Sequence, residues 1–298
     1  MKALDINILI TLLCWGLWGI VDKKALDYAR KEEVILRLYV VAAAIIPISF
    51  IALNLLYPGW KITPELCLWT GLASVSYTLS MFCYMAAMSG AEASFVLGIT
   101  AAYPLIFQFL ATVFLGEALV PQRLLGAAII AVGLFLIGGS EKKSGQPVSE
   151  ADSKKRNIVL LCIVMATFTW GVYGLFDKKA VSIAEPLEAY FVKALFDFAT
   201  FFLIWPLIAM RKKIDWRQKE AWIYCSVSEL LLAIGGLTYL GALAASTASY
   251  VISISGCYPL VMYLFAIVLL KEKFNSWRFA GIVLVVVGGL VVQLTEAL

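Results

Sequence analysis

Histidine is absent from this chain of 298 residues, and charged residues make up only 15% of it. Without histidine, zinc or haem ligation is not expected, so the sequence predicts no metal and no cofactor. The six cysteines stand singly with no C-x-x-C pair, and each is interpreted as a small apolar residue. No basic tract with interleaved aromatic residues occurs, which excludes nucleic acid as an expected partner.

Apolar residues dominate instead, at 62% of the chain, with a mean hydropathy of +0.90. This composition is typical of a polytopic membrane protein, whose partner is the lipid bilayer. Helices of about 20 residues cross the hydrocarbon core. Ten apolar runs approach this length, at 5–21, 34–56, 66–88, 93–115, 121–139, 157–176, 187–210, 219–243, 247–270 and 276–294.

One segment of the chain occurs twice. W-G-L-W-G-I-V-D-K-K-A at 15–25 reappears as W-G-V-Y-G-L-F-D-K-K-A at 170–180, with seven of eleven positions identical. The same shift of 155 residues relates Tyr84 to Tyr239, Tyr103-Pro104 to Tyr258-Pro259, Gly126 to Gly281, and Gly133 to Gly288. A register kept over this length indicates an internal duplication.

The duplication divides the chain into repeats at 1–140 and 157–298, joined by a flexible polar linker at 141–156. Each repeat holds five predicted helices, and this odd number turns the second repeat upside down in the membrane. We therefore predict an all-α membrane protein with ten transmembrane helices in two inverted five-helix repeats. Such repeats recur in secondary transporters, with the substrate site near the midplane between the halves.

The basic residues predict an orientation. Seventeen lysines and arginines fall in connections on the side opposite the N-terminus, and five fall on the N-terminal side. The positive-inside rule then places both termini outside the cytoplasm. We expect a multi-pass protein of a bacterial inner (plasma) membrane.

Several short motifs stand at corresponding positions in the two repeats or near the starts of the predicted spans. A Trp-Gly in the first span is followed by a lysine eight positions later (Trp15 to Lys23), and Arg37 stands early in the second span. More distinctive is the run of Y-P-L at 103–105, L-G-E at 115–117 and Q-R-L-L-G at 122–126. The second repeat echoes it as Y-P-L at 258–260, K-E-K at 271–273 and W-R-F-A-G at 277–281. Together with the two five-helix repeats, these motifs resemble the EamA type of the drug/metabolite transporter superfamily.

The resemblance implies a ten-helix carrier whose first four helices in each repeat surround a central cavity, with the fifth helices, at 121–139 and 276–294, on the periphery. It implies export or exchange of small metabolites without ATP. Superfamily substrates include amino acids, choline-like amines, sugars, nucleotide sugars and drugs.

Many members have cytoplasmic termini, against the charge count, so the orientation stays open. A homodimer through 121–139 and 276–294 is a further expectation. The second repeat departs from the pattern in having Lys271 where the first has Gly116, and Lys193 one position off the register of Arg37.

Ionisable residues inside the apolar runs are the sharpest indication of a site. Each costs about 2.5–3.5 kcal/mol at a helix centre and is normally turned toward the bundle interior. Lys193 and Asp197 lie four positions apart and so share a helix face; they are either substrate ligands or an internal ion pair. Glu229 has no partner in its own helix and is the stronger candidate. If transport is coupled to protons, Glu229 is the natural carrier in a chain without histidine.

Other residues are candidates with structural alternatives. Arg37 binds substrate or reaches the membrane interface; Trp15 and Trp170 stack on substrate or pack in the core. Tyr84 and Tyr239 carry hydroxyls that could bond a substrate. Each of the two prolines at mid-span should kink its helix, and kinked helices can act as gates. The predicted gating residues are Tyr103, Pro104, Tyr258 and Pro259.

These observations favour a secondary active transporter that works by alternating access on a small-molecule substrate, with a proton or counter-substrate as the coupled species. An amino acid or amine is the first expectation for the substrate, and a sugar or drug the alternative. A non-transporting scaffold or sensor is the rival from another class. An enzyme is not expected, because no nucleophile–base set is found.

Overall fold

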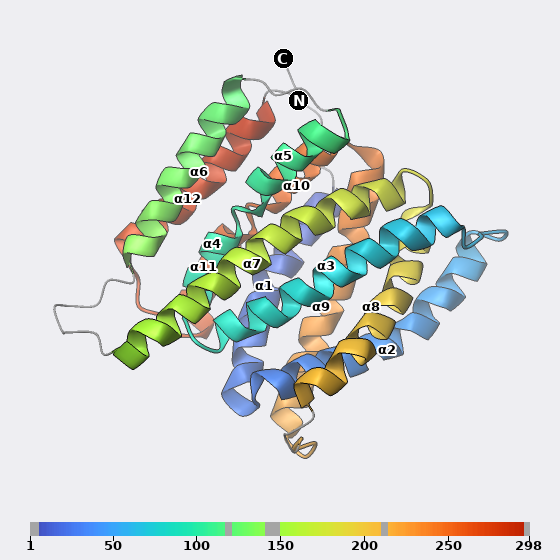
Figure 1. Cartoon of the computed structure of the whole chain (residues 1–298), viewed down its shortest axis with the longest axis horizontal. Helices are drawn as coiled ribbons and strands as arrows, with labels where there is room; N and C mark the ends of the chain where they lie inside the picture. Colours follow the sequence, from blue (N-terminus) through green and yellow to red (C-terminus); the bar gives the residue numbers. More distant parts are fainter. Residues whose placement is uncertain (1–5, 117–120, 141–149, 210–213, 295–298) are drawn as a thin grey trace.

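A computed structural model describes residues 6–116, 121–140, 150–209 and 214–294. All the regular elements in these ranges are α-helices (Figure 1). They are α1 (Ile6–Tyr28), α2 (Lys31–Leu56), α3 (Pro64–Met88), α4 (Ala93–Thr100), α5 (Tyr103–Phe114), α6 (Pro121–Ser140), α7 (Glu150–Val181), α8 (Pro186–Ala209), α9 (Lys219–Ala245), α10 (Ala248–Ser255), α11 (Tyr258–Leu269) and α12 (Ser276–Leu294).

The predicted spans and these helices agree, except that the fourth and ninth spans are each divided in two. Six helical stretches are long and apolar enough to cross a bilayer, and the joined α4–α5 segment at Ala93–Phe114 is one of them. Tyr258–Leu269 and Ser276–Val291 are shorter apolar helices. The chain is thus an all-α membrane protein of two inverted five-helix repeats. The last part of the predicted linker, 150–156, is helical, because α7 begins at Glu150; positions 141–149 lie outside the described residues.

Proline explains the divided spans. Pro104 and Pro259 stand in the first turn of α5 and α11. A proline lacks the N–H donor and its ring clashes with the carbonyl four residues earlier. Those positions are Thr100 and Ser255, where α4 and α10 end. Each predicted kink is thus a short interruption of the helix, at 101–102 and 256–257, and interrupted helices of this kind line the sites of transporters.

The packing follows the duplication. The first helix of each repeat packs against the third helix of the other, α1 on α9 and α7 on α3. The second helices, α2 and α8, contact each other, as do the fifth helices, α6 and α12. Figure 1 shows the α6–α12 pair at one edge of the molecule, away from α2 and α8. This exchange of equivalent contacts is what two inverted copies should produce.

Glycines let α6 and α12 approach closely. A Cβ added to Gly133 would lie 2.6 Å from the carbonyl oxygen of Gly281, and one added to Gly288 would lie 2.7 Å from that of Gly126. Small residues at such positions permit backbone contact between membrane helices. Because these glycines contact each other within the chain, a homodimer through α6 and α12 would have to use the other faces of the two helices.

Lys271 adopts the backbone conformation of its counterpart in the first repeat. Gly116 ends the first discontinuous span with φ +70°, and Lys271 has φ +55° at the equivalent place. A non-glycine residue in this left-handed region costs roughly 1–2 kcal/mol. The turn geometry is thus retained although the glycine that favours it has been replaced.

Candidate functional site

A cavity of about 120 Å³ lies between the two repeats. Residues of α1, α2, α3, α5, α7, α8, α9 and α11 line it. Since roughly 10–15 Å³ by this measure holds one water molecule, the cavity has room for a molecule of several heavy atoms. Its aromatic lining residues are Trp15, Trp18, Tyr39, Tyr77, Tyr103, Trp170, Tyr173, Tyr190, Phe198, Tyr239 and Tyr258.

The aromatic wall repeats the internal symmetry. Trp15 of α1 lies 5.0 Å from Tyr239 of α9, and their counterparts Trp170 of α7 and Tyr84 of α3 lie 5.5 Å apart, measured between ring centroids. Trp18 of α1 joins the second group, at 4.8 Å from Tyr84 and 6.0 Å from Trp170. Both first helices therefore present their tryptophans to the cavity between the repeats.

Lys193 and Asp197 form an ion pair on the α8 side of the cavity. The Nζ of Lys193 lies 3.6 Å from Oδ2 of Asp197. The two side chains share one face of α8, as their spacing of four residues predicts. The same ammonium lies 3.2 Å from the hydroxyl of Tyr173 and 4.7 Å from the ring centroids of Tyr77 and Tyr173. Lys193 is thus surrounded by groups that stabilise its charge.

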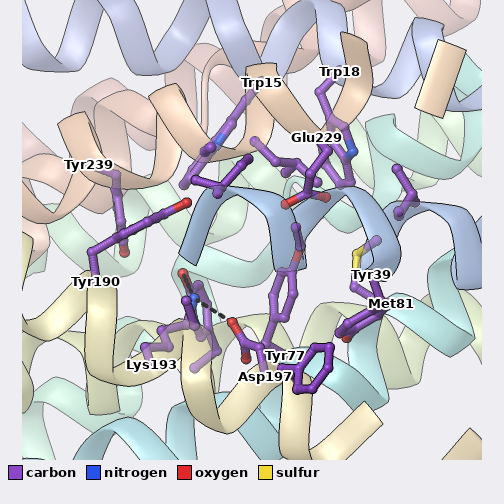
Figure 2. A pocket seen from close by; sticks show the side chains of 18 of the residues that line it. Trp15, Trp18, Tyr39, Tyr77, Met81, Tyr190, Lys193, Asp197, Glu229 and Tyr239 are labelled. Carbon is purple, nitrogen blue, oxygen red and sulfur yellow. Dashed lines mark hydrogen bonds and ion pairs between the residues drawn. The ribbon is translucent and has the colours of Figure 1, made fainter. Parts of the chain in front are cut away.

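Glu229 enters the cavity from α9, facing Lys193 and Asp197 (Figure 2). Within the part of the chain that the structure describes, Glu229 forms no salt bridge, and the ammonium of Lys193 is already paired with Asp197. The lining therefore combines one neutral ion pair with one carboxyl group that lacks a cation. All three ionisable residues belong to the second repeat, as the sequence predicts.

The remaining predicted site residues divide between the cavity and its surroundings. Trp15, Trp170, Tyr239, Tyr103 and Tyr258 line the cavity, and the hydroxyls of Tyr103 and Ser255 lie 3.2 Å apart. Pro104 and Pro259 set the breaks beside it. No observation tests whether these breaks act as gates, so that role stays a prediction.

Arg37 and Tyr84 do not line the cavity. Arg37 is fully buried and donates a hydrogen bond to the carbonyl oxygen of Asp215. Its Nη1 lies 3.9 Å from Oε2 of Glu33, and its Cζ lies 5.5 Å from the centroid of the Trp222 ring. Its guanidinium therefore ties α2 to the connection between α8 and α9. Tyr84 is fully buried behind Trp18 and Trp170, one layer away from the lining.

Sequence reasoning missed Asp22 and Asp177, the acidic residues of the duplicated segment. They are 0% and 1% exposed, and Oδ1 of Asp22 accepts a hydrogen bond from Ser228 at 2.5 Å. Two lysines follow each of these aspartates in the sequence, and lysines at the end of a span are expected at the membrane interface. The aspartates were therefore interpreted as part of the same charged helix end. Their identity in both copies was the signal that could have revealed them.

The comparisons with known proteins match this architecture. The model of the EamA-like transporter family matches residues 3–139 and 157–294, one match for each repeat. The chain belongs to this family. The protein is therefore an integral membrane protein and a membrane transporter.

Relatives of this EamA-like protein support the duplication. It is 24% identical over 228 residues to an uncharacterized transporter of Archaeoglobus fulgidus, covering 74% of each chain. It is 27% identical over 138 residues to an uncharacterized protein of Methanocaldococcus jannaschii, covering 46% of this chain and 97% of that one, which is thus about one repeat long. A solved crystal structure with 16% identity matches at a TM-score of 0.69, over 97% of this chain and 96% of the other, and shows the same fold.

Proposed function

We propose that this EamA-like protein is a secondary active carrier of a small amine or amino acid. The observation that carries the proposal is the Glu229 carboxyl, which faces an aromatic-lined cavity without a cationic partner among the described residues. A protonated amine supplies the missing positive charge, and the charge of a carboxyl at membrane depth is otherwise costly.

The aromatic wall suits the same ligand. A cation within about 6 Å of a Trp or Tyr ring face gains roughly 0.5–2 kcal/mol, and tryptophan is the best such partner. Trp15, Trp18 and Tyr39 line the cavity together with Glu229. An ammonium group beside Glu229 is therefore favoured by both charge and ring contact. An amino acid would in addition direct its carboxylate toward Lys193 on the facing helix.

The contacts at the two ends of the bundle support alternating access. At one end Glu33 accepts a hydrogen bond from the backbone N–H of Asp215 at 3.2 Å, next to buried Arg37. At the other end the equivalent residue, Glu188, accepts one from the backbone N–H of Lys61 at 3.3 Å, in an exposed contact. Equivalent contacts thus close the ends unequally, as in a carrier resting in one of its two access states.

The test is ligand-dependent stability of the purified protein. A panel of amines, amino acids, sugars, nucleotides and drugs is screened by thermal unfolding, where a ligand at 100 times its Kd stabilises by about 2.7 kcal/mol. We expect an amine or amino acid to stabilise the wild type and the exposed control Glu220→Gln, but not Glu229→Gln. Stabilisation by a neutral sugar, equal in wild type and Glu229→Gln, would contradict the proposal.

A further inference from the structure

The first turn of α4 is capped by a carboxylate from the other repeat. Glu92, the residue before this helix, makes no side-chain cap of its own. Instead Glu272, which stands between α11 and α12, accepts a hydrogen bond from the backbone N–H of Ala93 at 3.0 Å. Its second oxygen accepts a hydrogen bond from the hydroxyl of Ser94. The first N–H groups of a helix lack partners within it and carry partial positive charge, so a carboxylate stabilises them.

Arg278 of α12 completes this contact between the repeats. Its Nη1 donates a hydrogen bond to the hydroxyl oxygen of Ser94 at 2.6 Å. The same atom lies 2.5 Å from Oε2 of Glu92 and 3.7 Å from Oε2 of Glu272. The side chains of Arg278 and Glu272 are both buried. Interactions between charges are stronger in such surroundings than at the surface, because less water screens them.

The contact holds the connection between α3 and α4 from the side of the second repeat. From the side of the first repeat, Lys23 binds the carbonyl oxygens of Met88 and Ala91 in the same connection. The helices on both sides of this connection lead to the cavity. Tyr77 of α3 lines it, and so does Tyr103 of α5, the helix that follows α4.

The contact lies at the end of the bundle that Arg37 also occupies. The bonds of Lys23 place the end of α1 beside the end of α3, and α2 begins where α1 has ended. Near the start of α2, Arg37 binds Asp215 of the second repeat. Two contacts between the repeats, each with a buried arginine, therefore close this end.

The charges of the contact stay balanced if the repeats separate. Glu272 and Arg278 belong to the same repeat, so they remain paired with each other when α4 moves away. The side chain of Glu92 is 51% exposed and is hydrated without the arginine. Water replaces the carboxylate at the first N–H groups of α4. Separation thus leaves no buried charge without a partner, which is the condition that makes breaking a buried ion pair costly.

We propose that Glu272 and Arg278 form a latch between the repeats, which holds the α3–α4 connection and keeps the Arg37 end of the cavity closed. The inference rests on the alternating access in the proposed function. When one end of a carrier with inverted repeats opens, one repeat moves away from the other at that end. The latch is then released before the Arg37 end opens and forms again when that end closes.

Hydrogen exchange of the purified protein in nanodiscs, without any substrate, tests the latch. Glu272→Gln weakens it, and Asp27→Asn is the control, because Asp27 is an exposed acid at the same end. We expect Glu272→Gln to speed exchange by about fivefold or more in residues 93–96 and also in 214–224, at the separate contact of Arg37. Exchange should slow at the opposite end, in 57–63 and 186–190, where Glu188 accepts the hydrogen bond from Lys61. Asp27→Asn should change none of these segments.

Three results would overturn the proposal. Faster exchange confined to 93–96 would mean that Glu272 only caps α4, unchanged exchange would mean that it does not hold this end, and equal changes in Asp27→Asn would remove the specificity. If Glu272→Gln does not fold, Ser94→Ala decides by the same pattern, because it removes the hydroxyl that contacts both Glu272 and Arg278 and keeps both charges. Since no ligand is present, failure here leaves amine binding standing, and failure of the amine panel leaves the latch standing.

Discussion

The Nζ of Lys23 lies 2.6 Å from the carbonyl oxygen of Met88, at the end of α3. Its second bond, to Ala91, also measures 2.6 Å. Lys178 repeats both contacts in the second repeat, with the carbonyl oxygens of Leu243 and Ser246 at 2.6 and 3.0 Å. The last carbonyls of a helix have no partner within the helix, so each lysine stabilises the end of the third helix of its own repeat.

Removing this lysine should destabilise the protein. Hydrogen bonds to a charged group contribute about 1.5–3 kcal/mol, so we expect Lys23→Met to lower the free energy of unfolding by about that amount. Lys24→Met is the matched control, because Lys24 only pairs with Asp27 at the surface, at 3.3 Å. Its expected cost is below about 1 kcal/mol. Denaturant unfolding in detergent compares the two, and equal losses would refute the capping role.

The Lys193–Asp197 pair should behave as a coupled unit. Lys193→Met leaves the Asp197 charge buried without its partner, and breaking such a pair costs about 3–5 kcal/mol. The double variant Lys193→Met/Asp197→Leu should recover most of this loss, because neither charge remains. A double-mutant cycle on unfolding free energies measures the coupling. Additive losses would show that the two side chains do not depend on each other.

Arg37 should hold one end of the bundle closed. We expect Arg37→Gln to speed hydrogen exchange in residues 214–224 and at the start of α2, because the bond to Asp215 and the pairing with Glu33 are weakened. Arg217→Gln, which removes an exposed arginine from the same connection, serves as control. Unchanged exchange in Arg37→Gln would mean that this contact does not close the end.

Replacing Lys271 with glycine, the residue at the equivalent position 116 of the first repeat, should stabilise the protein. Since its φ of +55° is unfavourable for any side chain, Lys271→Gly should raise the unfolding free energy by about 1 kcal/mol. Lys273→Gly removes an exposed lysine nearby, where no positive φ occurs, and should not stabilise. Thermal unfolding distinguishes the two variants; stabilisation by neither, or by both alike, would contradict the strain at position 271.

The helices and most of the cavity could be predicted because they depend on local patterns. Long apolar runs define the spans, and Pro104 and Pro259 locate the breaks through their missing donors. Lys193, Asp197 and Glu229 face inward because charges in a membrane helix avoid lipid. The duplication predicted a cavity shared by both repeats, because it related Trp15 to Trp170. No single span shows this relationship.

The surroundings of Arg37 and Asp22 could not be predicted, because they come from distant parts of the chain. The partner of Arg37, Asp215, is 178 positions away, and that of Asp22, Ser228, is 206 positions away. A helix pattern shows that a residue is inside a span but not which of the other helices faces it. For the same reason, the sequence could not show that Tyr84 lies behind Trp18 and Trp170 and outside the cavity lining.

Solute counterflow in proteoliposomes tests the central claim most directly, which is that Glu229 in the aromatic cavity binds a cationic group during transport. Vesicles preloaded with the amine or amino acid that stabilises the protein are diluted into a trace of its radiolabelled form. We predict rapid accumulation for wild type and Glu220→Gln, and a loss of about tenfold or more for Glu229→Gln, since a charged contact is worth about 1.5–3 kcal/mol. Equal accumulation by Glu229→Gln and the wild type would contradict the account.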